Sequence, residues 1–195
     1  MSTIEVNTIN PQSGNDITIG GSSKNVKFAS GTTVDFSTNT PTLTLGAAMK
    51  NTPAFQAYLG AKQTVSSGTT TKINLNTEVF DSDSMYDAST NYRFTPTIAG
   101  KYFCFLNVEL SWDSGYGDVG EAEIQKNGSS ALRTRFILQT GTDNGFYGVQ
   151  NVSGILDFNG SSDYIEGYAK YDGSSPFFVQ GSNKTFFGAY RIIGA

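Results

Sequence analysis

Short runs in which apolar and polar residues alternate recur over the last three quarters of the chain, with turn sequences between them. Alternation with a period of two is typical of β-strands that bury one face. The turns "KNGSS", "TDNG", "FNGSSD" and "YDGSS" contain Asn-Gly or Asp-Gly steps, which suit tight hairpins. The predicted strands cover residues 54–59, 72–75, 91–94, 101–112, 121–126, 132–139, 146–158, 164–171 and 185–193. Because no helical period separates them, we expect an all-β, antiparallel jelly-roll sandwich of about ten strands.

The predicted strand over residues 101–112 begins with apolar residues on both faces. The residues of one face, which would fill a core, are Tyr102, Cys104, Leu106, Val108 and Leu110. The opposite face begins with Phe103 and Phe105, although a solvated antiparallel sheet normally carries polar residues there. Exposed aromatic strands favour aggregation, so we expect both rings to be covered, either by a loop of the same chain or by a neighbouring subunit.

Residues 1–51 have alternating apolar pairs that are too sparse for a core of their own. Such a segment either stays disordered or pairs with copies of itself or with a larger surface, and its regular β-branched pattern favours pairing. We therefore expect an extended, β-rich N-terminal arm over residues 1–51 and a head over residues 52–195. A single helical turn is predicted over residues 47–50, before Pro53. The arm residues expected to anchor it are Ile4, Val6, Ile9, Ile17 and Ile19.

Charge and composition exclude several classes of partner. The chain has 195 residues, a formal net charge of −4 and a pI of about 4.7, so no general field attracts nucleic acid or an anionic membrane. The N-terminal sequence lacks the basic and apolar regions of a secretory signal, and no stretch has the length of a membrane span. We expect synthesis in the cytoplasm without export, and no membrane insertion. The single Cys104 is expected to be a buried thiol.

The common catalytic motifs are missing from the sequence. The chain has no histidine, which removes Ser-His-Asp triads, Cys-His pairs and histidine metal sites, and it lacks G-x-S-x-G and P-loop motifs. Carboxylates could still serve a glycosidase, but those present lie in turns, where hydrogen bonds to the local backbone are the simpler explanation. The two clusters are Asp81, Asp83 and Asp87, and Asp113, Asp118 and Glu121. We expect no enzymatic activity and no cofactor.

Two predicted loops carry aromatic residues that suit contact with a ligand. Trp112 and Tyr116 lie in "SWDSGYGDVG", and Phe146 and Tyr147 lie in "QTGTDNGFYG". Aromatic rings beside carboxylates and amides are typical of surfaces that contact carbohydrate or protein. The alternative for each loop is structural, with Trp112 closing one end of the sandwich.

Five segments in a fixed order resemble the globular heads of complement C1q and its tumour-necrosis-factor-like relatives. They are "PAFQAYL", "NLNTEVFDSDSMYDASTNYRFTPTIAGKYFCFLNVEL", "AEIQKNGSS", "VSGILDFNGSSDYIEGYA" and "FFGAYRI", spread over about residues 53–193. The resemblance implies a ten-stranded jelly roll that forms a homotrimer, with Phe103 and Phe105 as candidates for the interface between subunits. Some members of this family bind calcium near the trimer axis, so calcium is the cofactor that the resemblance allows.

The opening of the arm, "STIEVNTINPQSGNDITIGG", resembles the short N-terminal segments of fibre and decoration proteins of marine bacteriophages. The resemblance implies a virion structural protein at the particle surface, a capsid or tail fibre whose arm binds other virion proteins. Its head would attach the particle to a host-surface glycan or protein. The alternatives are a cement protein that stabilises the capsid, a non-viral C1q-like recognition protein and, last, a carboxylate-based glycan hydrolase.

Overall fold

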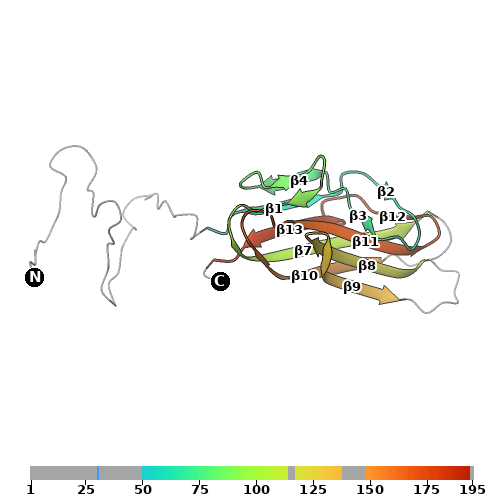
Figure 1. The fold of residues 1–195 in the computed structure, drawn as a ribbon. Coiled ribbons are helices and arrows are strands. Elements are labelled where there is room, and N and C mark those ends of the chain that lie inside the picture. The colour runs from blue at the N-terminus through green and yellow to red at the C-terminus, as the bar shows by residue number, and fades with distance from the viewer. Residues whose placement is uncertain (1–29, 31–49, 114–116, 138–147, 194–195) are drawn as a thin grey trace, which may run out of the picture. The chain divides into compact units, whose positions relative to one another are not determined.

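The computed structural model describes residues 30, 50–113, 117–137 and 148–193, and these residues contain strands and turns but no helix (Figure 1). The first strands are β1 (Ala54–Tyr58), β2 (Gln63–Thr64), β3 (Thr71–Lys72), β4 (Thr77–Asp81), β5 (Tyr86–Asp87) and β6 (Arg93–Phe94). The long strands are β7 (Gly100–Trp112), β8 (Gly117–Lys126), β9 (Ser129–Ile137), β10 (Gly148–Phe158) and β11 (Ile165–Gly173). The chain of strands ends with β12 (Pro176–Phe178) and β13 (Phe186–Arg191).

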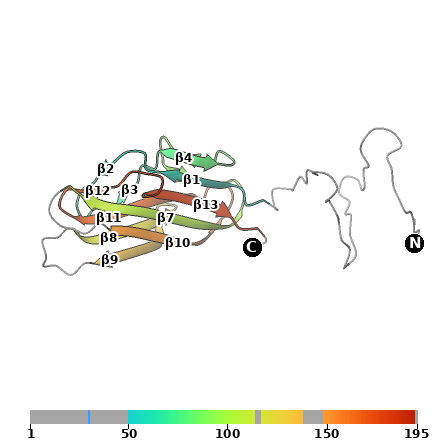
Figure 2. The same cartoon turned by 180° about the vertical axis from the view of Figure 1, so that it is seen from behind.

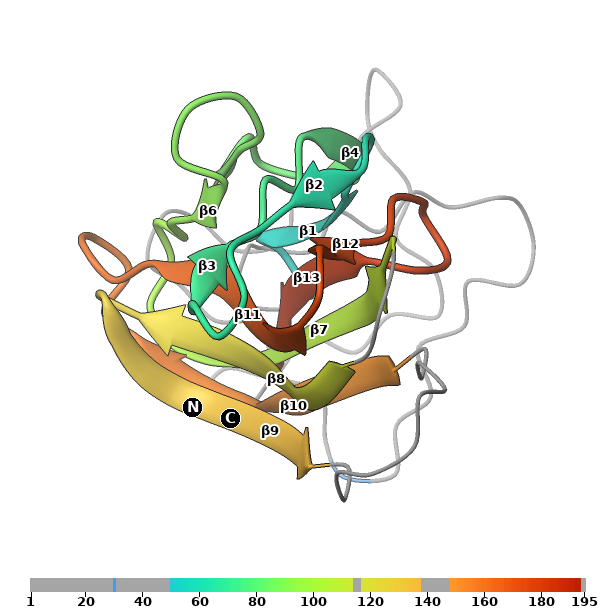
Figure 3. The same ribbon diagram turned by 90° about the vertical axis from the view of Figure 1, so that its right-hand side faces the viewer.

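The strands form two antiparallel sheets, which we name after their central strands. In the β7 sheet the order is β2-β12-β7-β13-β1-β4. Strand β10 belongs to the same sheet and pairs with β7, and every residue of β10 has a partner on β7 (Figure 2). In the β11 sheet the order is β5-β6-β11-β8-β9, and β3 also pairs with β11. Figure 3 looks along the strands and separates the two layers. Apart from the β5–β6 and β8–β9 hairpins, the described strands that lie side by side are not consecutive in the sequence, as expected for a jelly roll.

The core lies between the sheets and is rich in aromatic rings. Phe55 of β1 stacks on Tyr86 and on Phe94, with ring centroids 4.5 Å apart in each case, and meets Phe187 edge-on at 5.2 Å. Because Tyr86 and Phe94 belong to the β11 sheet while Phe55 and Phe187 belong to the β7 sheet, these contacts join the two layers. Each such pair contributes about 0.5–1.5 kcal/mol beyond the burial of its area.

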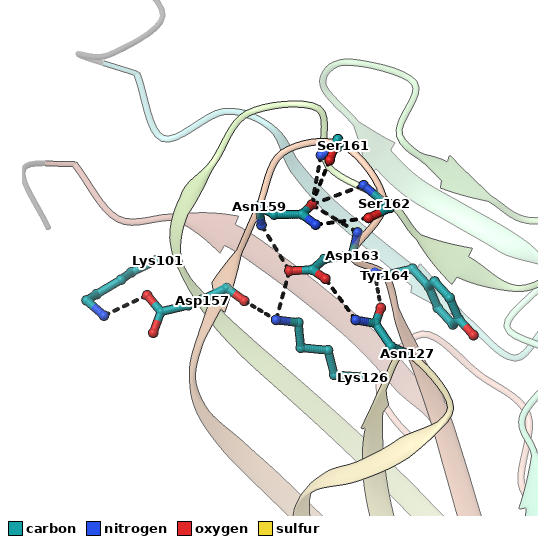
Figure 4. Close-up of polar contacts among 9 residues, drawn as sticks. All are labelled: Lys101, Lys126, Asn127, Asp157, Asn159, Ser161, Ser162, Asp163 and Tyr164. Carbon is teal, nitrogen blue, oxygen red and sulfur yellow. Dashed lines mark hydrogen bonds and ion pairs between the residues drawn. The ribbon is translucent and has the colours of Figure 1, made fainter.

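Polar side chains join the β8–β9 hairpin to the turn between β10 and β11 (Figure 4). Asp163 accepts hydrogen bonds from the Nδ2 of Asn127 (2.8 Å) and the backbone N–H of Asn159 (2.9 Å), and it pairs with Lys126 (2.9 Å). The Lys126 and Asn127 side chains are the main reason why the pKa of Asp163 falls to about 2. The left-handed φ angles of Asn127 (52°) and Gly128 (76°) confirm the tight hairpin predicted from "KNGSS".

The predicted fold class is confirmed for the head, and the long predicted strands lie within a few residues of β7, β8, β9, β10 and β11. The short strands β2, β4, β5 and β12 were not predicted. Strand β4 escapes the period-of-two signal because three consecutive residues at its centre are exposed and its pairing with β1 contains a bulge. Residues 1–29 and 31–49 of the predicted arm, including residues 47–49 of the helical turn, lie outside the described residues, so the arm and its boundary after residue 51 stay predictions.

Candidate assembly surface

The register of the β7 sheet places aromatic residues in neighbouring rows on its outer surface. From β10 through β7 and β13 to β1, one row is Ile155, Phe103, Tyr190 and Ala54. The next row is Ser153, Phe105, Gly188 and Gln56, and the third is Asn151, Asn107, Phe186 and Tyr58. Strand β4 extends the second row with Phe80, the partner of Gln56. We call this surface the aromatic face; its members are Tyr58, Phe80, Phe103, Phe105, Ile155, Phe186 and Tyr190.

The rings of the aromatic face pack against one another and remain partly open to solvent. Phe103 lies 5.5 Å from Tyr190 and 6.2 Å from Phe105, and Phe105 lies 6.2 Å from Phe186, measured between ring centroids. Phe103 and Phe105 are therefore half-buried by their neighbours on the same surface. Ile155 remains 57% exposed, Phe80 46% and Tyr190 41%. The surface carries apolar side chains on five strands, with the polar Gln56 and Ser153 among them, and exposed apolar patches of this kind mark binding interfaces.

Glycine at position 188 allows one ring to lie flat on the sheet. A Cβ built on Gly188 would come within 2.3 Å of the Cζ of Phe105 and 2.8 Å of the backbone oxygen of Phe55. Any larger residue at position 188 would displace the Phe105 ring. In the sequence "FFGAY", Phe186 and Tyr190 lie two residues before and two residues after Gly188, on either side of this ring. This covering of a strand glycine by an aromatic ring fixes the position of Phe105 on the aromatic face.

Polar pairs border the aromatic face at both ends of β7. At one end the Nζ of Lys101 lies 2.6 Å from the Oδ1 of Asp157 across the β7–β10 pair. At the other end Glu109 accepts hydrogen bonds from the Nζ of Lys184 at 2.7 Å and 3.0 Å, and Asn107 donates to the backbone oxygen of Lys184. An apolar centre with a polar rim is the usual anatomy of a protein–protein interface.

The outer surface of the β11 sheet has the opposite character, because charged side chains cover it and pair with one another. Glu166 is only 2% exposed and binds the Nζ of Lys72 at 2.7 Å and the Nη2 of Arg93 at 2.8 Å. On the neighbouring strands Glu121 lies 3.2 Å from the Nε of Arg135. Such a surface is well suited to remain in water, so the two faces of the sandwich differ in the contacts they can make.

The predicted ligand-contact residues are only partly visible. Trp112 is half-buried, packs against the core and lies 6.2 Å from the ring of Tyr171. Tyr116, Phe146 and Tyr147 lie outside the described residues, as do the predicted anchoring residues Ile4, Val6, Ile9, Ile17 and Ile19. The role of these residues in binding stays a prediction.

The first carboxylate cluster, Asp81, Asp83 and Asp87, forms local contacts, as its turn sequence predicted, whereas the prediction is wrong for the second, in which Asp118 and Glu121 lie in strand β8 and Glu121 pairs with Arg135 of β9. Asp87 accepts hydrogen bonds from the backbone N–H groups of Thr90 (2.9 Å) and Ser89 (3.0 Å), which hold the pKa of its carboxyl well below the ordinary value. Asp113 instead pairs with Lys62 at 2.6 Å. Within the part of the chain that the structure describes, no group of three or more His, Cys, Asp and Glu side chains is placed to hold a metal ion.

Cys104 has the environment that the sequence predicted. Its thiol is free, fully buried and faces the core from β7, and burial raises its pKa to about 12. The thiol is therefore protonated at neutral pH and unsuited to act as a nucleophile.

Most of the aromatic face was missed in the sequence, since only Phe103 and Phe105 were predicted for an interface. A signal was present in "FFGAY", where Phe186, Gly188 and Tyr190 alternate with the buried Phe187 and Ala189. Single-strand alternation shows that both faces are apolar. It does not show which strands lie side by side, and only the pairing of the strands reveals that the apolar residues form one patch.

Comparison with known proteins relates this architecture to the tumour-necrosis-factor fold. No protein-family model matches the sequence, and no curated protein matches it. Among solved structures, murine APRIL is similar with a TM-score of 0.51 at 12% identity, covering 71% of this chain and 98% of its own. Eiger TNF from S. frugiperda is similar with a TM-score of 0.54 at 10% identity, covering 73% of this chain and 93% of its own. At this identity the likeness shows the fold, so the head is a tumour-necrosis-factor-like jelly roll.

Proposed function

We propose that this protein is a non-enzymatic virion structural protein whose jelly-roll heads assemble as a homotrimer and attach the particle to a host-surface ligand. The observation that carries the proposal is the aromatic face, an apolar patch with a polar rim that, among the described residues, lies on one side of the sandwich. In a monomer this patch would favour aggregation, whereas burial against another copy removes it from water.

The contact that we propose is between two different surfaces of the head. Among the described residues strand β10 pairs only with β7, and exposed aliphatic side chains outside the aromatic face lie along and beside it: Val149 is 57% exposed and Ile137 of β9 is 65% exposed. The β10 edge of one copy can therefore cover the aromatic face of the next. A contact between unlike surfaces closes into a ring when the rotation between copies allows it, and three copies form the ring in this proposal.

Trimerisation gives the proposed attachment its strength. Three identical heads raise the effective concentration of any weak site for a repeated ligand, so a host surface can be held without a single tight contact. The virion part of the proposal is supported by the resemblance of the N-terminal segment to phage fibre and decoration proteins. In this arrangement the arm binds other virion proteins through its β-branched residues.

The mass of the full chain in solution, measured by light scattering after size exclusion, tests the assembly. We expect three times the chain mass of 20.9 kDa. Phe103→Asp places a charge at the centre of the aromatic face without touching the core, and we expect the mass of one chain. Ser130→Asp, on the exposed side of β9, is the matched control and should remain a trimer. A wild-type monomer contradicts the trimer, and a trimeric Phe103→Asp variant contradicts the interface.

The attachment role is tested on particles assembled without this protein. Intact particles that no longer adsorb to the host support attachment. Particles that adsorb normally but fall apart on mild heating contradict it, and indicate a cement protein on the capsid instead.

A further inference from the structure

A hollow of about 410 Å³ lies beside the β5–β6 hairpin, away from the aromatic face. Its lining includes the residues Ser84, Asn91, Arg93 and Thr95. The sequence singled out none of these four residues as a contact site. All four carry hydrogen-bonding groups, and this hollow is open to solvent, so it suits a small polar ligand.

The hairpin that forms the hollow is held rigidly from inside. Besides Ser89 and Thr90, the Asp87 carboxylate accepts hydrogen bonds from the backbone N–H (3.0 Å) and the Nδ2 (2.8 Å) of Asn91. Asn91 is thus fixed through its nitrogen atoms. Among the described residues, no hydrogen bond uses its Oδ1, which remains available as an acceptor.

Arg93 is oriented from two directions. Its Nε donates to the Oε1 of Glu166 at 3.0 Å, its Nη2 lies 2.8 Å from the same oxygen, and its guanidinium lies 4.1 Å from the centre of the Tyr164 ring. These contacts leave the Nη1 without a partner in the described part of the chain, and the side chain is 31% exposed. A pre-oriented guanidinium loses little freedom when it donates to a ligand.

The backbone beside the hollow adopts left-handed conformations that residues other than glycine rarely take. Ser84 has a φ of 56° and Tyr92 a φ of 51°. Each costs about 1–2 kcal/mol, which the contacts of the surrounding hairpin must offset. Ser84 and Thr95 also keep hydroxyl groups for which the described residues supply no hydrogen-bond partner.

Positive charge is not in excess around the hollow, where Asp81 accepts from the backbone N–H of the lining residue Tyr86 and Asp83 precedes Ser84. Arg93 and Lys72 carry positive charge, while Glu166 and Asp87 carry negative charge, and Glu166 pairs with both cations. No excess positive charge remains to attract a phosphate, sulfate or carboxylate. What remains is a set of neutral donors and acceptors beside a planar guanidinium and a planar amide, which together match adjacent hydroxyl groups on a ring.

We propose that this hollow binds a neutral sugar unit through adjacent hydroxyl groups, which Arg93, Asn91, Thr95 and Ser84 contact. The inference rests on the proposed binding role of the head, for which it names a ligand class and a site, and it does not depend on the trimer. The affinity of one such open site for a sugar is low. Repetition of the site on a particle raises the overall binding strength through multivalency.

Saturation-transfer NMR on the full chain, with D-glucose, D-galactose, D-mannose and N-acetyl-D-glucosamine as probes, tests the proposal. We expect transfer to at least one of these sugars. Thr95→Val removes one free hydroxyl without a change of shape, and the loss of one hydrogen bond should weaken binding about five-fold. Thr64→Val, the same substitution on the exposed edge strand β2, is the control and should bind as the wild type does.

A second variant guards against a change in folding. Ser84→Ala removes the other hydroxyl while keeping a residue of similar backbone preference, and circular dichroism checks that both variants fold as the wild type does. Binding of no sugar by the wild type overturns the proposal, and so does binding that both variants retain in full. The NMR signal reports sugar binding whether the chain is a monomer or a trimer. If the wild type is a monomer and binds a sugar, the proposed trimer is wrong and the proposed sugar site stands. A trimer that binds no sugar contradicts the sugar site alone.

Discussion

At the scale of single residues, two glycines of the β7 sheet have close neighbours of different kinds. One lies against backbone and the other against the end of a side chain. Gly188 lies against the Phe105 ring and against the backbone oxygen of Phe55. Gly154, on β10, faces the side-chain end of Leu132, where a Cβ would come within 2.8 Å of a Cδ atom. A side-chain end can rotate away, whereas a strand carbonyl is held by its sheet.

We therefore predict that Gly188→Ala lowers the free energy of unfolding by about 1–3 kcal/mol, the usual cost of overpacking. Gly154→Ala should cost clearly less, because Leu132 can adopt another rotamer. Urea denaturation of both variants measures the difference. Equal losses for the two variants would show that the contact with the Phe55 carbonyl is not what excludes a side chain at position 188.

The low pKa of Asp163, about 2 against an ordinary 3.8, makes stability depend on pH in a defined direction. A carboxyl whose pKa is lower in the folded than in the unfolded state stabilises the fold above the ordinary value, and this contribution is lost as the pH falls toward the folded value. We predict that Asp163→Asn is less stable than the wild type near neutral pH, and that the difference shrinks as the pH falls from about 4 to about 2.

Urea denaturation at several pH values measures the Asp163 effect. Asp113→Asn, which removes an exposed ion pair with Lys62, is the control and should change stability little at any pH. If the difference in the free energy of unfolding between Asp163→Asn and the wild type stays constant from about pH 4 to about pH 2, the Asp163 carboxylate is not the group that stabilises the fold.

At the scale of elements, the two sheets hold their outer surfaces by different means, and Glu166 is central to the β11 sheet. It accepts from Lys72, Arg93 and the hydroxyl of Tyr168 while being almost fully buried. We predict that Glu166→Gln lowers the free energy of unfolding by about 2–3 kcal/mol, because two cations lose their partner. Asp157→Asn breaks only an exposed pair with Lys101 and should cost about 0–1 kcal/mol. Thermal unfolding of both variants checks the ranking, and equal losses would contradict it.

The long strands could be predicted from sequence because each buries one face in the core, and burial produces a period of two. Strand β7 also showed its second apolar face in the sequence, through Phe103 and Phe105. Short strands were invisible for the converse reason: β12 has three residues and begins with Pro176, and β2 has two. A strand of two or three residues is too short to show a period of two. Its neighbours in the sheet, and not its own composition, make it a strand.

The candidate sites were predictable to different degrees. Alternation exposed two rings of the aromatic face, but its other members come from β1, β4, β10 and β13, and only sheet order brings them together. The hollow at Arg93 and Asn91 had no sequence signal, because its polar groups belong to a turn rich in Ser, Thr and Asn, where such residues are ordinary. Its shape depends on Glu166 and Tyr164, which lie more than sixty residues further along the chain.

At the scale of the whole molecule, the proposed trimer is held mainly by apolar contact, since the ion pairs lie at the rim of the aromatic face. Salt screens exposed charges but leaves apolar burial intact. We predict that the mass of the full chain in light scattering stays constant from about 0.05 M to about 1 M NaCl. Dissociation of the trimer at high salt would indicate that charged contacts hold it.

The burial of Cys104 gives the molecule a built-in reporter of its own opening. The chain has one thiol, located at the centre of β7 between the sheets. A thiol reagent can reach it only when the sandwich separates, so the rate of labelling measures how often that happens. The same reagent, applied to the wild-type chain and to the Phe103→Asp variant, would report how much the proposed assembly slows the opening of each head.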